Sequence, residues 1–386
     1  MAKISNRKHN LKSPSLPYHR IVVKFGTRLL TGGGAYLNQE VMSGLVAQVA
    51  QLHGQGLELL IVSSGAITAG RYKLGLTKQV KGIPVKQVCS SVGQNRLMSI
   101  YEQLFSQHNI TVAQALLTKV DLSDRAGYLN ARNTLLALME LWVLCIVNEN
   151  DVVAVDEIEE AKFGDNDNLS AMVSNLVDAD LLLILTDTAG LHTADPQRDS
   201  NARLIAHVDK IDVEIERLAE NNAPSSPGTG GMLTKVEAAK LATASGVTVI
   251  IADGKQPDVI LKIAAGEAIG TCFTPITNKL ESRQRWMLSG LSTKGNLLVD
   301  SGAVVALMKH KRSLLAAGIR QIEGEFQRGD IVNICDSNGI CLCCGITNYS
   351  SADLGIIKGV HSRKISGLLG YDYGSEVVRR NNLVLL

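Results

Sequence analysis

The feature that most constrains the fold of this chain is a series of short apolar runs rich in Val, Ile and Leu. These runs lie at residues 21–25, 57–62, 111–116, 143–147, 181–185 and 247–251. Longer segments with apolar residues at helical spacing lie between several of them, at residues 38–54, 84–108, 126–141 and 231–245. Buried strands that alternate with helices favour a mainly parallel sheet with helices on both faces. We therefore predict an α/β fold with an open, mainly parallel sheet sandwiched by helices.

The sequence changes in character after about residue 275. Apolar runs become shorter and are separated by Gly, Asp, Asn and Ser, which is typical of a small β-rich domain. These runs lie at residues 297–299, 304–307, 331–335 and 340–344. A length of 386 residues is sufficient for two domains. We predict a disordered basic tail, an α/β domain, a linker, a β-rich domain and a C-terminal tail, at residues 1–18, 19–275, 276–290, 291–376 and 377–386.

The composition favours a cytoplasmic protein. Seven Cys residues are an odd number for a disulfide framework, so we expect reduced thiols. No apolar run reaches about 18 residues, so we expect no membrane span. The first 18 residues are polar and basic and lack the apolar segment of a secretory signal. Residues 281–386 contain 13 basic and 9 acidic side chains, which is too small an excess to indicate nucleic-acid binding by itself.

Polar or glycine-containing turns follow most of the predicted strands. They are Gly26-Thr27, Ser63-Ser64-Gly65-Ala66, Asn148-Glu149-Asn150-Asp151, Thr186-Asp187 and Ala252-Asp253-Gly254. In open parallel sheets, ligands bind outside the carboxyl ends of the strands. We therefore expect these turns to converge on one edge of the sheet although they are far apart in the sequence.

One stretch, residues 164–171, alternates carboxylates with carboxamides before an apolar helical pattern begins. Asp and Asn favour turns and helix N-caps, so the simplest interpretation is a capped loop. However, Asp165 and Asp167 lie two residues apart, and like carboxylates repel unless cations or ligand donors lie between them. The stretch therefore predicts a polar, cation-containing site at a helix N-terminus.

Glycine-rich turns accompany two lysines. Lys24 precedes Gly26 at a strand end, and the segment 228–235 opens a helix with Lys235 about one turn inside it. Glycine lets backbone N–H groups approach phosphate oxygens closely, and a helix N-terminus adds partial positive charge. The segment 228–235 lacks the spacing of a P-loop, and no G-x-G-x-x-G follows the first strand. The pattern indicates a phosphate-binding edge of another kind.

Histidine and cysteine spacing does not indicate a metal centre. The eight His residues show no ligand spacing, and the C-x-C-C arrangement at residues 341–344 suits zinc poorly. We predict no metal site built from protein side chains and a structural role for the clustered thiols.

The ordered set of motifs resembles the amino acid kinase family, and within it the glutamate 5-kinases. The motifs that carry the resemblance, from about residue 19 to 275, are KFGT at 24–27, SSGAI at 63–67, NEND at 148–151, GDNDNLS at 164–170, LTD at 185–187, GLHTADP at 190–196 and GTGGMLTK at 228–235. The segments RGDIVNICD at 328–336 and GLLGYDYG at 367–374 resemble a PUA domain. Two features depart from the family pattern: Arg28 stands where a small Ser is frequent, and the first 18 residues have no family counterpart.

The resemblance implies ATP-dependent phosphorylation of the L-glutamate γ-carboxylate to L-glutamyl 5-phosphate, the first step of proline biosynthesis. It also implies Mg²⁺, proline as a feedback inhibitor and a homo-oligomer, either a dimer or a tetramer. The residue chemistry agrees, because a carboxylate nucleophile is already ionised at neutral pH and needs no general base. The remaining difficulty is repulsion between that anion and a polyphosphate, which positioned cations relieve. We expect the phosphates to carry most of the Mg²⁺ coordination.

Individual roles follow from matching the motifs. We expect Lys24 and Lys235 to stabilise the transferring phosphoryl group, with Asp167 orienting both lysines. The expected ATP-binding residues are Lys24, Gly26, Thr27, Thr186, Asp187, Thr229, Gly230, Gly231, Met232, Leu233, Thr234 and Lys235. The expected substrate-binding residues are Ser64, Gly65, Asn148, Asp151, Asp165 and Asn166, with Asp151 suited to the substrate ammonium.

Two alternatives remain open at this point. One is a related kinase that acts on acetylglutamate, aspartate, carbamate or a nucleoside monophosphate. The other is RNA binding through the C-terminal domain, because PUA domains are common in RNA-binding proteins.

Overall fold

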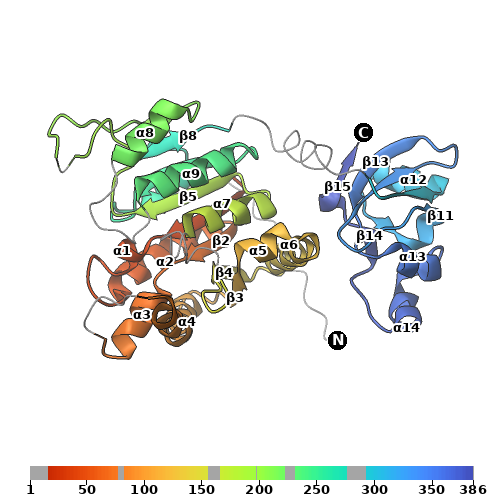
Figure 1. Ribbon diagram of the computed structural model, residues 1–386, viewed down its shortest axis with the longest axis horizontal. Helices are drawn as coiled ribbons and strands as arrows, with labels where there is room; N and C mark the ends of the chain where they lie inside the picture. Colours follow the sequence, from red (N-terminus) through yellow and green to blue (C-terminus); the bar gives the residue numbers. More distant parts are fainter. Residues whose placement is uncertain are drawn as a thin grey trace. The chain divides into compact units, whose positions relative to one another are not determined.

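The computed structural model describes residues 16–76, 82–154, 166–196, 198–221, 231–275 and 293–385 (Figure 1). The chain forms two compact units, which we call the large unit and the small unit. The large unit comprises Met1–Ser123 and Asn130–Lys279, and the small unit comprises Asp124–Leu129 and Leu280–Leu386. The predicted linker 276–290 and most of the predicted tail 1–18 lie outside the described residues. The predicted bounds of the N-terminal tail and of the linker therefore stay a prediction.

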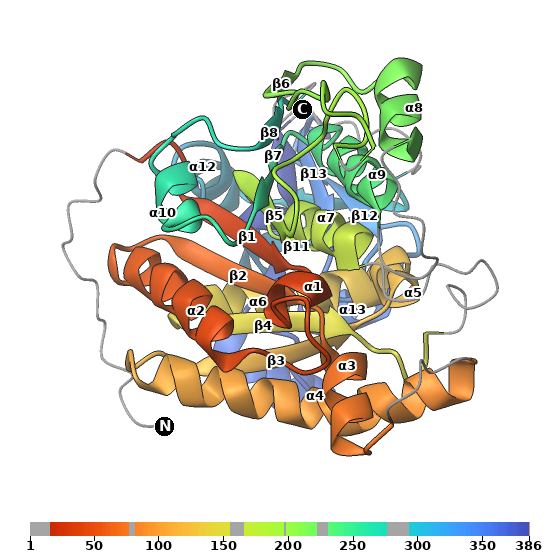
Figure 2. The ribbon, with the colours of Figure 1, turned by 90° about the vertical axis from the view of Figure 1, so that its left-hand side faces the viewer.

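An eight-stranded sheet forms the centre of the large unit, in the order β3-β4-β2-β1-β5-β7-β8-β6. Its strands are β1 (Arg20–Phe25), β2 (Glu58–Ser63), β3 (Val112–Leu117), β4 (Leu144–Glu149), β5 (Leu181–Thr186), β6 (His207–Val208), β7 (Thr248–Asp253) and β8 (Thr271–Phe273). All of the pairings are parallel except that of β7 with β8. The predicted mainly parallel sheet is confirmed, and Figure 2 shows β3, β4, β2 and β1 following one another across it.

Helices cover both faces of this sheet. They are α1 (Thr27–Leu30), α2 (Gln39–Gly54), α3 (Ala66–Lys73), α4 (Ile83–Ser106), α5 (Lys119–Ser123), α6 (Arg125–Glu140), α7 (Asn166–Leu176), α8 (Val213–Asn221), α9 (Met232–Thr243) and α10 (Val259–Ala264). On one face, Ile21, Val23 and Phe25 of β1 join a core with residues of α2, α4 and α10. Successive strand side chains point to opposite faces, so Lys24 lies on the other face. There, α7 packs against β1 and against α9.

Two glycines bring α3 and α4 into direct backbone contact. A Cβ atom built on Gly70 would lie 1.7 Å from the carbonyl oxygen of Cys89, and one built on Gly93 would lie 1.8 Å from that of Ala66. No larger residue fits at either position without moving a helix backbone. This contact fixes α4 beside the turn that connects β2 to α3.

The small unit is β-rich, as predicted. It contains a five-stranded sheet in the order β11-β9-β12-β13-β15 and a two-stranded sheet of β10 and β14. The strands are β9 (Gly295–Val299), β10 (Leu314–Leu315), β11 (Ile319–Glu323), β12 (Ile331–Cys335), β13 (Cys341–Ile346), β14 (Glu376–Val378) and β15 (Leu383–Leu385). The helices are α12 (Ser301–Met308), α13 (Ser351–Ile357) and α14 (Ile365–Leu369), with 3-10 turns η1 (Ala316–Gly318), η2 (Ser362–Lys364) and η3 (Arg380–Asn382).

Three expectations differ from the structure of the small unit. The apolar run 304–307 belongs to helix α12, because Asp300 caps that helix by accepting a hydrogen bond from the backbone of Ala303. Most of residues 377–386 form no separate tail, since β15 pairs with β13. The expectation of reduced thiols is wrong for Cys335 and Cys341, which form a disulfide.

No helix in the described part of the chain is long and apolar enough to cross a membrane.

Candidate functional site

The functional residues predicted from sequence gather where the strands β1, β2, β4 and β5 end and the helices α7 and α9 begin. Lys24 is the penultimate residue of β1, and Asp167 and Lys235 lie in the first turns of α7 and α9. Helix α7 begins at Asn166, so the polar stretch that we interpreted as a loop forms the first turn of the helix from that residue onward. Asp165, Thr229 and Gly230 lie outside the described residues.

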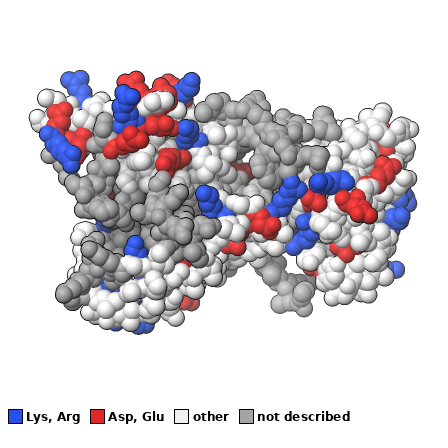
Figure 3. Space-filling model, in the orientation of Figure 1, with Lys and Arg blue, Asp and Glu red and all other residues white. Residues whose placement is uncertain are grey.

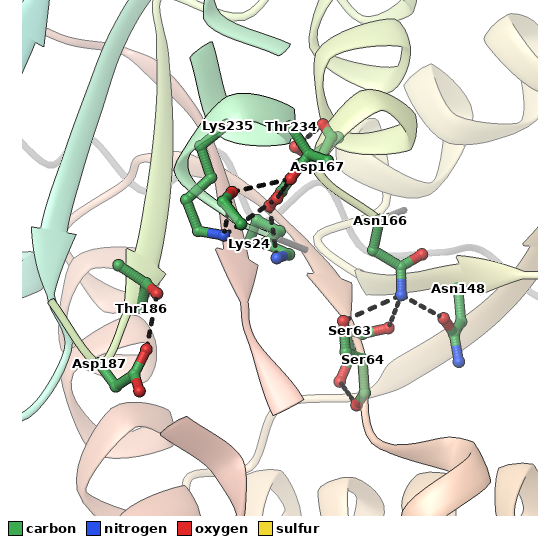
Figure 4. Close-up of polar contacts among 12 residues, drawn as sticks. Lys24, Ser63, Ser64, Asn148, Asn166, Asp167, Thr186, Asp187, Thr234 and Lys235 are labelled. Atoms are coloured by element: carbon green, nitrogen blue, oxygen red, sulfur yellow. Dashed lines mark hydrogen bonds and ion pairs between the residues drawn. The ribbon is translucent and has the colours of Figure 1, made fainter. Parts of the chain in front are cut away.

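A charged cluster forms around Asp167. Lys24 Nζ lies 2.5 Å from Asp167 Oδ1, and Lys235 Nζ lies 3.2 Å from Oδ2 (Figure 4). The hydroxyl of Thr234 donates a hydrogen bond of 2.8 Å to Oδ2. Lys24, Lys235 and Asp167 are only 6%, 5% and 1% exposed. The structure therefore brings together the two lysines and the carboxylate that the sequence analysis assigned to one site.

The electrostatics of this cluster favour an anionic ligand. Burial alone would raise the pKa of Asp167, but the ammonium groups of Lys235 and Lys24 outweigh burial and hold the pKa well below its usual range. Asp167 is therefore ionised at neutral pH. Among the described residues, one carboxylate faces two ammonium groups, so this part of the cluster carries an excess of positive charge that favours an anionic ligand.

The beginning of α9 contributes to the same cluster. Gly231 is the N-cap residue of α9. Its carbonyl oxygen accepts a hydrogen bond from Lys235 Nζ at 3.3 Å and lies 3.0 Å from Thr234 Oγ1, which shares its single proton with Asp167. Met232 and Leu233 follow in the first turn. The unsatisfied N–H groups of such a turn favour phosphate oxygens.

The ends of β1 and β5 place the other expected nucleotide-binding residues together. The backbone N–H of Gly26 donates to Leu185 O at 3.1 Å, and a Cβ on Gly26 would lie 3.9 Å from Lys24 Nζ. Thr186 Oγ1 donates to Asp187 Oδ1 at 3.2 Å. Arg28, whose role the sequence left undefined, forms an ion pair with Asp187 at 3.5 Å.

A second cluster, which we call the amide cluster, lies beside the charged one. Asn166 Nδ2 donates to Ser63 O at 3.1 Å, to Ser64 Oγ at 3.0 Å and to Asn148 Oδ1 at 3.0 Å (Figure 4). Asn148 Nδ2 in turn donates to Gln94 Oε1 at 2.8 Å. These contacts join three of the residues that we expected to bind the substrate, namely Ser64, Asn148 and Asn166.

Gly65 and Asp151 complete the expected substrate-binding residues in the described part of the chain. Gly65 is the N-cap residue of α3 with a φ of 104°, a left-handed conformation that favours glycine. Asp151 accepts a hydrogen bond from the hydroxyl of Ser90. Ser90, Gln94 and Asp151 line a cavity of about 650 Å³ between α4 and the ends of β3 and β4.

The sequence analysis missed the contribution of α4. Ser90 and Gln94 were treated only as part of a long helical pattern. The signal available was a pair of polar residues four positions apart, which places them on one face of a helix.

Similarity to known proteins extends over most of this chain. The amino acid kinase family matches residues 19–253, and the PUA domain matches residues 295–369. A glutamate 5-kinase of Dehalococcoides mccartyi is 60% identical over 369 residues, which cover 96% of this chain and 99% of that protein. Glutamate 5-kinases of Herpetosiphon aurantiacus and Shewanella oneidensis are 48% and 47% identical, covering 95% and 96% of this chain and 98% and 99% of those proteins. The chain therefore belongs to the amino acid kinase family and carries a PUA domain.

Proposed function

We propose that this chain catalyses the ATP-dependent phosphorylation of the side-chain carboxylate of L-glutamate to L-glutamyl 5-phosphate, the first step of proline biosynthesis. The observation that carries the proposal is the pair of buried lysines sharing Asp167, directly beside a neutral amide cluster. Full-length similarity to proteins named glutamate 5-kinase supports it. The same similarity disfavours the related kinases that act on other acceptors.

The proposed reaction requires no general base. An oxygen of the ionised γ-carboxylate forms a bond to the γ-phosphorus of ATP, while the bond from that phosphorus to the bridging oxygen breaks and ADP leaves. Both reactants are anions, so repulsion is the main obstacle. Lys24 and Lys235 would offset it, and Asp167 would hold the two ammonium groups in place without taking a proton.

The nucleotide would lie over the ends of β1 and β5 and the beginning of α9. We assign its contacts to Gly26, Thr27, Thr186, Asp187, the segment 229–235 and Lys24. A Cβ atom at position 26 would lie 3.9 Å from Lys24 Nζ, so glycine at this position keeps side-chain atoms away from the ammonium group that we expect to contact phosphate oxygens. Arg28 would keep the Asp187 carboxylate oriented through their ion pair.

The amino acid would lie over the ends of β2 and β4. We assign its contacts to Ser64, Gly65, Asn148, Asp151 and Asn166, and also to Asp165 outside the described residues. The Asp151 carboxylate suits the substrate ammonium.

Mg²⁺ would neutralise charge on the ATP phosphates when bound. Among the described residues, no three His, Cys, Asp or Glu side chains lie close enough together to hold a metal ion. Both oxygens of Asp167 already face lysines. We therefore assign Mg²⁺ ligation to the phosphates and water rather than to a protein cage.

We extend the proposal to a cytoplasmic location, a homo-oligomer and feedback inhibition by proline, as the family resemblance implies. An RNA-binding role for the small unit is not favoured. On the face shown in Figure 3, its Lys and Arg side chains alternate with Asp and Glu instead of forming one basic surface.

The test is a product assay on the purified full-length protein with ATP and Mg²⁺. Hydroxylamine traps an acyl phosphate as a hydroxamate, and a coupled assay measures ADP. We expect both signals with L-glutamate and at least tenfold weaker signals with N-acetyl-L-glutamate or L-aspartate, because an acetyl group removes the ammonium charge and a shorter side chain misplaces the carboxylate. Preference for either analogue would overturn the proposed substrate.

A further inference from the structure

Helix α4 supplies a wall of the substrate site that the expected motifs do not include. Ser90, which is buried, and Gln94, which is half-buried, lie one turn apart on this helix. Each contacts a residue that follows or ends strand β4: Ser90 donates to the Asp151 carboxylate, and Gln94 accepts from the Asn148 side chain.

The hydrogen bonds from Gln94 to Asn166 form a relay with a defined direction. Gln94 Oε1 accepts from Asn148 Nδ2 at 2.8 Å, and Asn148 Oδ1 accepts from Asn166 Nδ2 at 3.0 Å. A carboxamide has a donor end and an acceptor end of almost the same shape, so its orientation depends on its partners. Gln94 therefore orients Asn148 together with the backbone N–H of Glu149, which donates to Asn148 Oδ1 at 2.9 Å. Asn148 orients Asn166 together with Ser63 O.

The relay ends in an acceptor for which the described residues provide no donor. Asn166 Nδ2 faces three acceptors, and its Oδ1 atom points away from them (Figure 4). Asn166 is 5% exposed, and Oδ1 has no hydrogen-bond partner among the described residues. A buried acceptor without a partner costs free energy, so its retention indicates a ligand that donates a hydrogen bond there.

The backbone that carries Gln94 is held firmly. Gly93, its neighbour, lies against the backbone of α3, where a Cβ would come within 1.8 Å of Ala66 O. Tyr101, further along α4, shares a hydrogen bond of 2.8 Å with Ser63, the residue whose carbonyl accepts from Asn166. Both ends of the relay are thus fixed relative to each other.

We propose that Gln94 is a positioning residue for substrate recognition: through Asn148 it orients Asn166 so that Oδ1 accepts a hydrogen bond from the α-ammonium group of an amino-acid substrate. This inference rests on the proposed function, and it adds a specificity determinant on α4. Gln94 itself need not contact the substrate. Its effect is on which ligands bind, since the lysines that act on the phosphoryl group belong to the other cluster.

The experiment compares L-glutamate with glutarate, which lacks the ammonium group. Dissociation constants of both ligands are measured by titration calorimetry for the wild type and for Gln94→Met, which removes the acceptor for Asn148. We expect Gln94→Met to weaken glutamate binding roughly 3- to 10-fold and to leave glutarate binding almost unchanged, so that discrimination between them falls. The KM for ATP should not change.

Two further variants test whether the loss of discrimination comes from the acceptor that Gln94 provides for Asn148. Gln87→Met is the matched control: Gln87 lies on the same helix and donates to the backbone oxygen of Val152, outside the relay, so discrimination should stay at the wild-type level. Gln94→Glu retains an oxygen that accepts from Asn148 Nδ2. It should keep discrimination at or above the wild-type level, because its added charge repels the doubly charged glutarate more than glutamate.

A double-mutant cycle tests whether Gln94 acts through Asn148. In an Asn148→Ala background, Gln94→Met should cause little further loss of glutamate affinity. The inference is overturned if Gln94→Met weakens both ligands equally, if it changes neither, or if the two losses add. A wild type that binds glutamate but forms no acyl phosphate would contradict the proposed function, while the binding ratios would still decide on Gln94.

Discussion

Adjacent residues on the first turn of α7 belong to two different kinds of polar cluster. Asp167 joins two lysines and a threonine in a cluster built on charge. Asn166 joins Ser64, Asn148 and Gln94 in a cluster of neutral hydrogen bonds. Both clusters are buried, yet only the first contains ionised groups among its described members.

The difference indicates a division of tasks. Coulombic attraction has no preferred direction, so paired ammonium groups can stabilise a phosphoryl group throughout its transfer, while its negative charge is redistributed. Hydrogen bonds from amides are directional, so they can distinguish one amino acid from another without adding charge beside the lysines. Exchanging the chemistry of Asn166 and Asp167 should therefore harm the protein in two distinguishable ways.

The largest expected effect is that of Asp167→Asn on stability. The variant leaves two buried ammonium groups without their shared carboxylate. Removing one partner from a buried ion pair costs about 3–5 kcal/mol. We expect a loss of that size in the free energy of unfolding, measured by urea denaturation at pH 7.

A matched control for this loss is Asp187→Asn. Its carboxylate pairs with a half-exposed Arg28 at 3.5 Å, and such surface pairs contribute at most about 1 kcal/mol. If the two variants lose equal stability, the charged cluster is no more important to the fold than a surface ion pair.

The second effect is on turnover. Lys235→Ala removes a donor to the transferring phosphoryl group, which should lower kcat on the order of 10²–10³-fold. The fold should remain, since Lys24 still pairs with Asp167 at 2.5 Å. Lys240→Ala, on the same helix but exposed and paired with Glu216, should retain wild-type kcat. Retention of more than about a tenth of the wild-type rate by Lys235→Ala would exclude the assigned role.

The third effect tests the neutral cluster. Asn166→Asp replaces the donor group by an oxygen that faces the acceptors Ser63 O and Asn148 Oδ1. Leaving these groups unpaired should cost about 1–3 kcal/mol of unfolding free energy. Calorimetry should also show weaker glutamate binding. Wild-type stability and affinity in this variant would show that the cluster does not need a neutral amide.

Much of the first cluster was predictable, because parallel strands end at the same edge of a sheet. The apolar runs before Lys24 and Thr186 fixed where those residues emerge, and the turn before α9 located Lys235. The second cluster was only partly predictable. Asn148 follows a predicted strand and Asn166 precedes a predicted helix, so both positions carried a signal. Gln94 lies inside a long helix, and the apolar spacing of that helix reveals only its core-facing side.

The contact between α3 and α4 explains why the role of Gln94 could not be predicted from the sequence. Gly70 and Gly93 allow α3 and α4 to touch, and that contact brings Gln94 against Asn148. A sequence shows the two glycines but not that they face each other. The same limit applies to Arg28, whose partner Asp187 lies on another strand's end.

The smallest effect distinguishes the clusters by the pH range in which the stability deficit of each variant shrinks. The pKa of Asp167 is lowered in the folded state by the two lysines, so its stabilisation is complete above the unfolded pKa, near 3.8, and is lost as pH falls through the folded pKa. The stability difference between wild type and Asp167→Asn should therefore be constant from pH 7 to about 5. It should then narrow in stronger acid, by at most about 1.4 kcal/mol per pH unit.

Asn166→Asp should show its change in a different, less acidic pH range. Its new carboxylate is buried and faces acceptors, which raises its pKa above the unfolded value, so protonation restores a donor and the stability deficit shrinks on going from pH 7 to pH 5. Urea denaturation of the three proteins at pH 7, 6, 5, 4 and 3 measures both trends. Constant deficits for Asn166→Asp between pH 7 and 5 would mean that a charge is tolerated in the amide cluster. The contrast between directional amides and paired charges would then lose its basis.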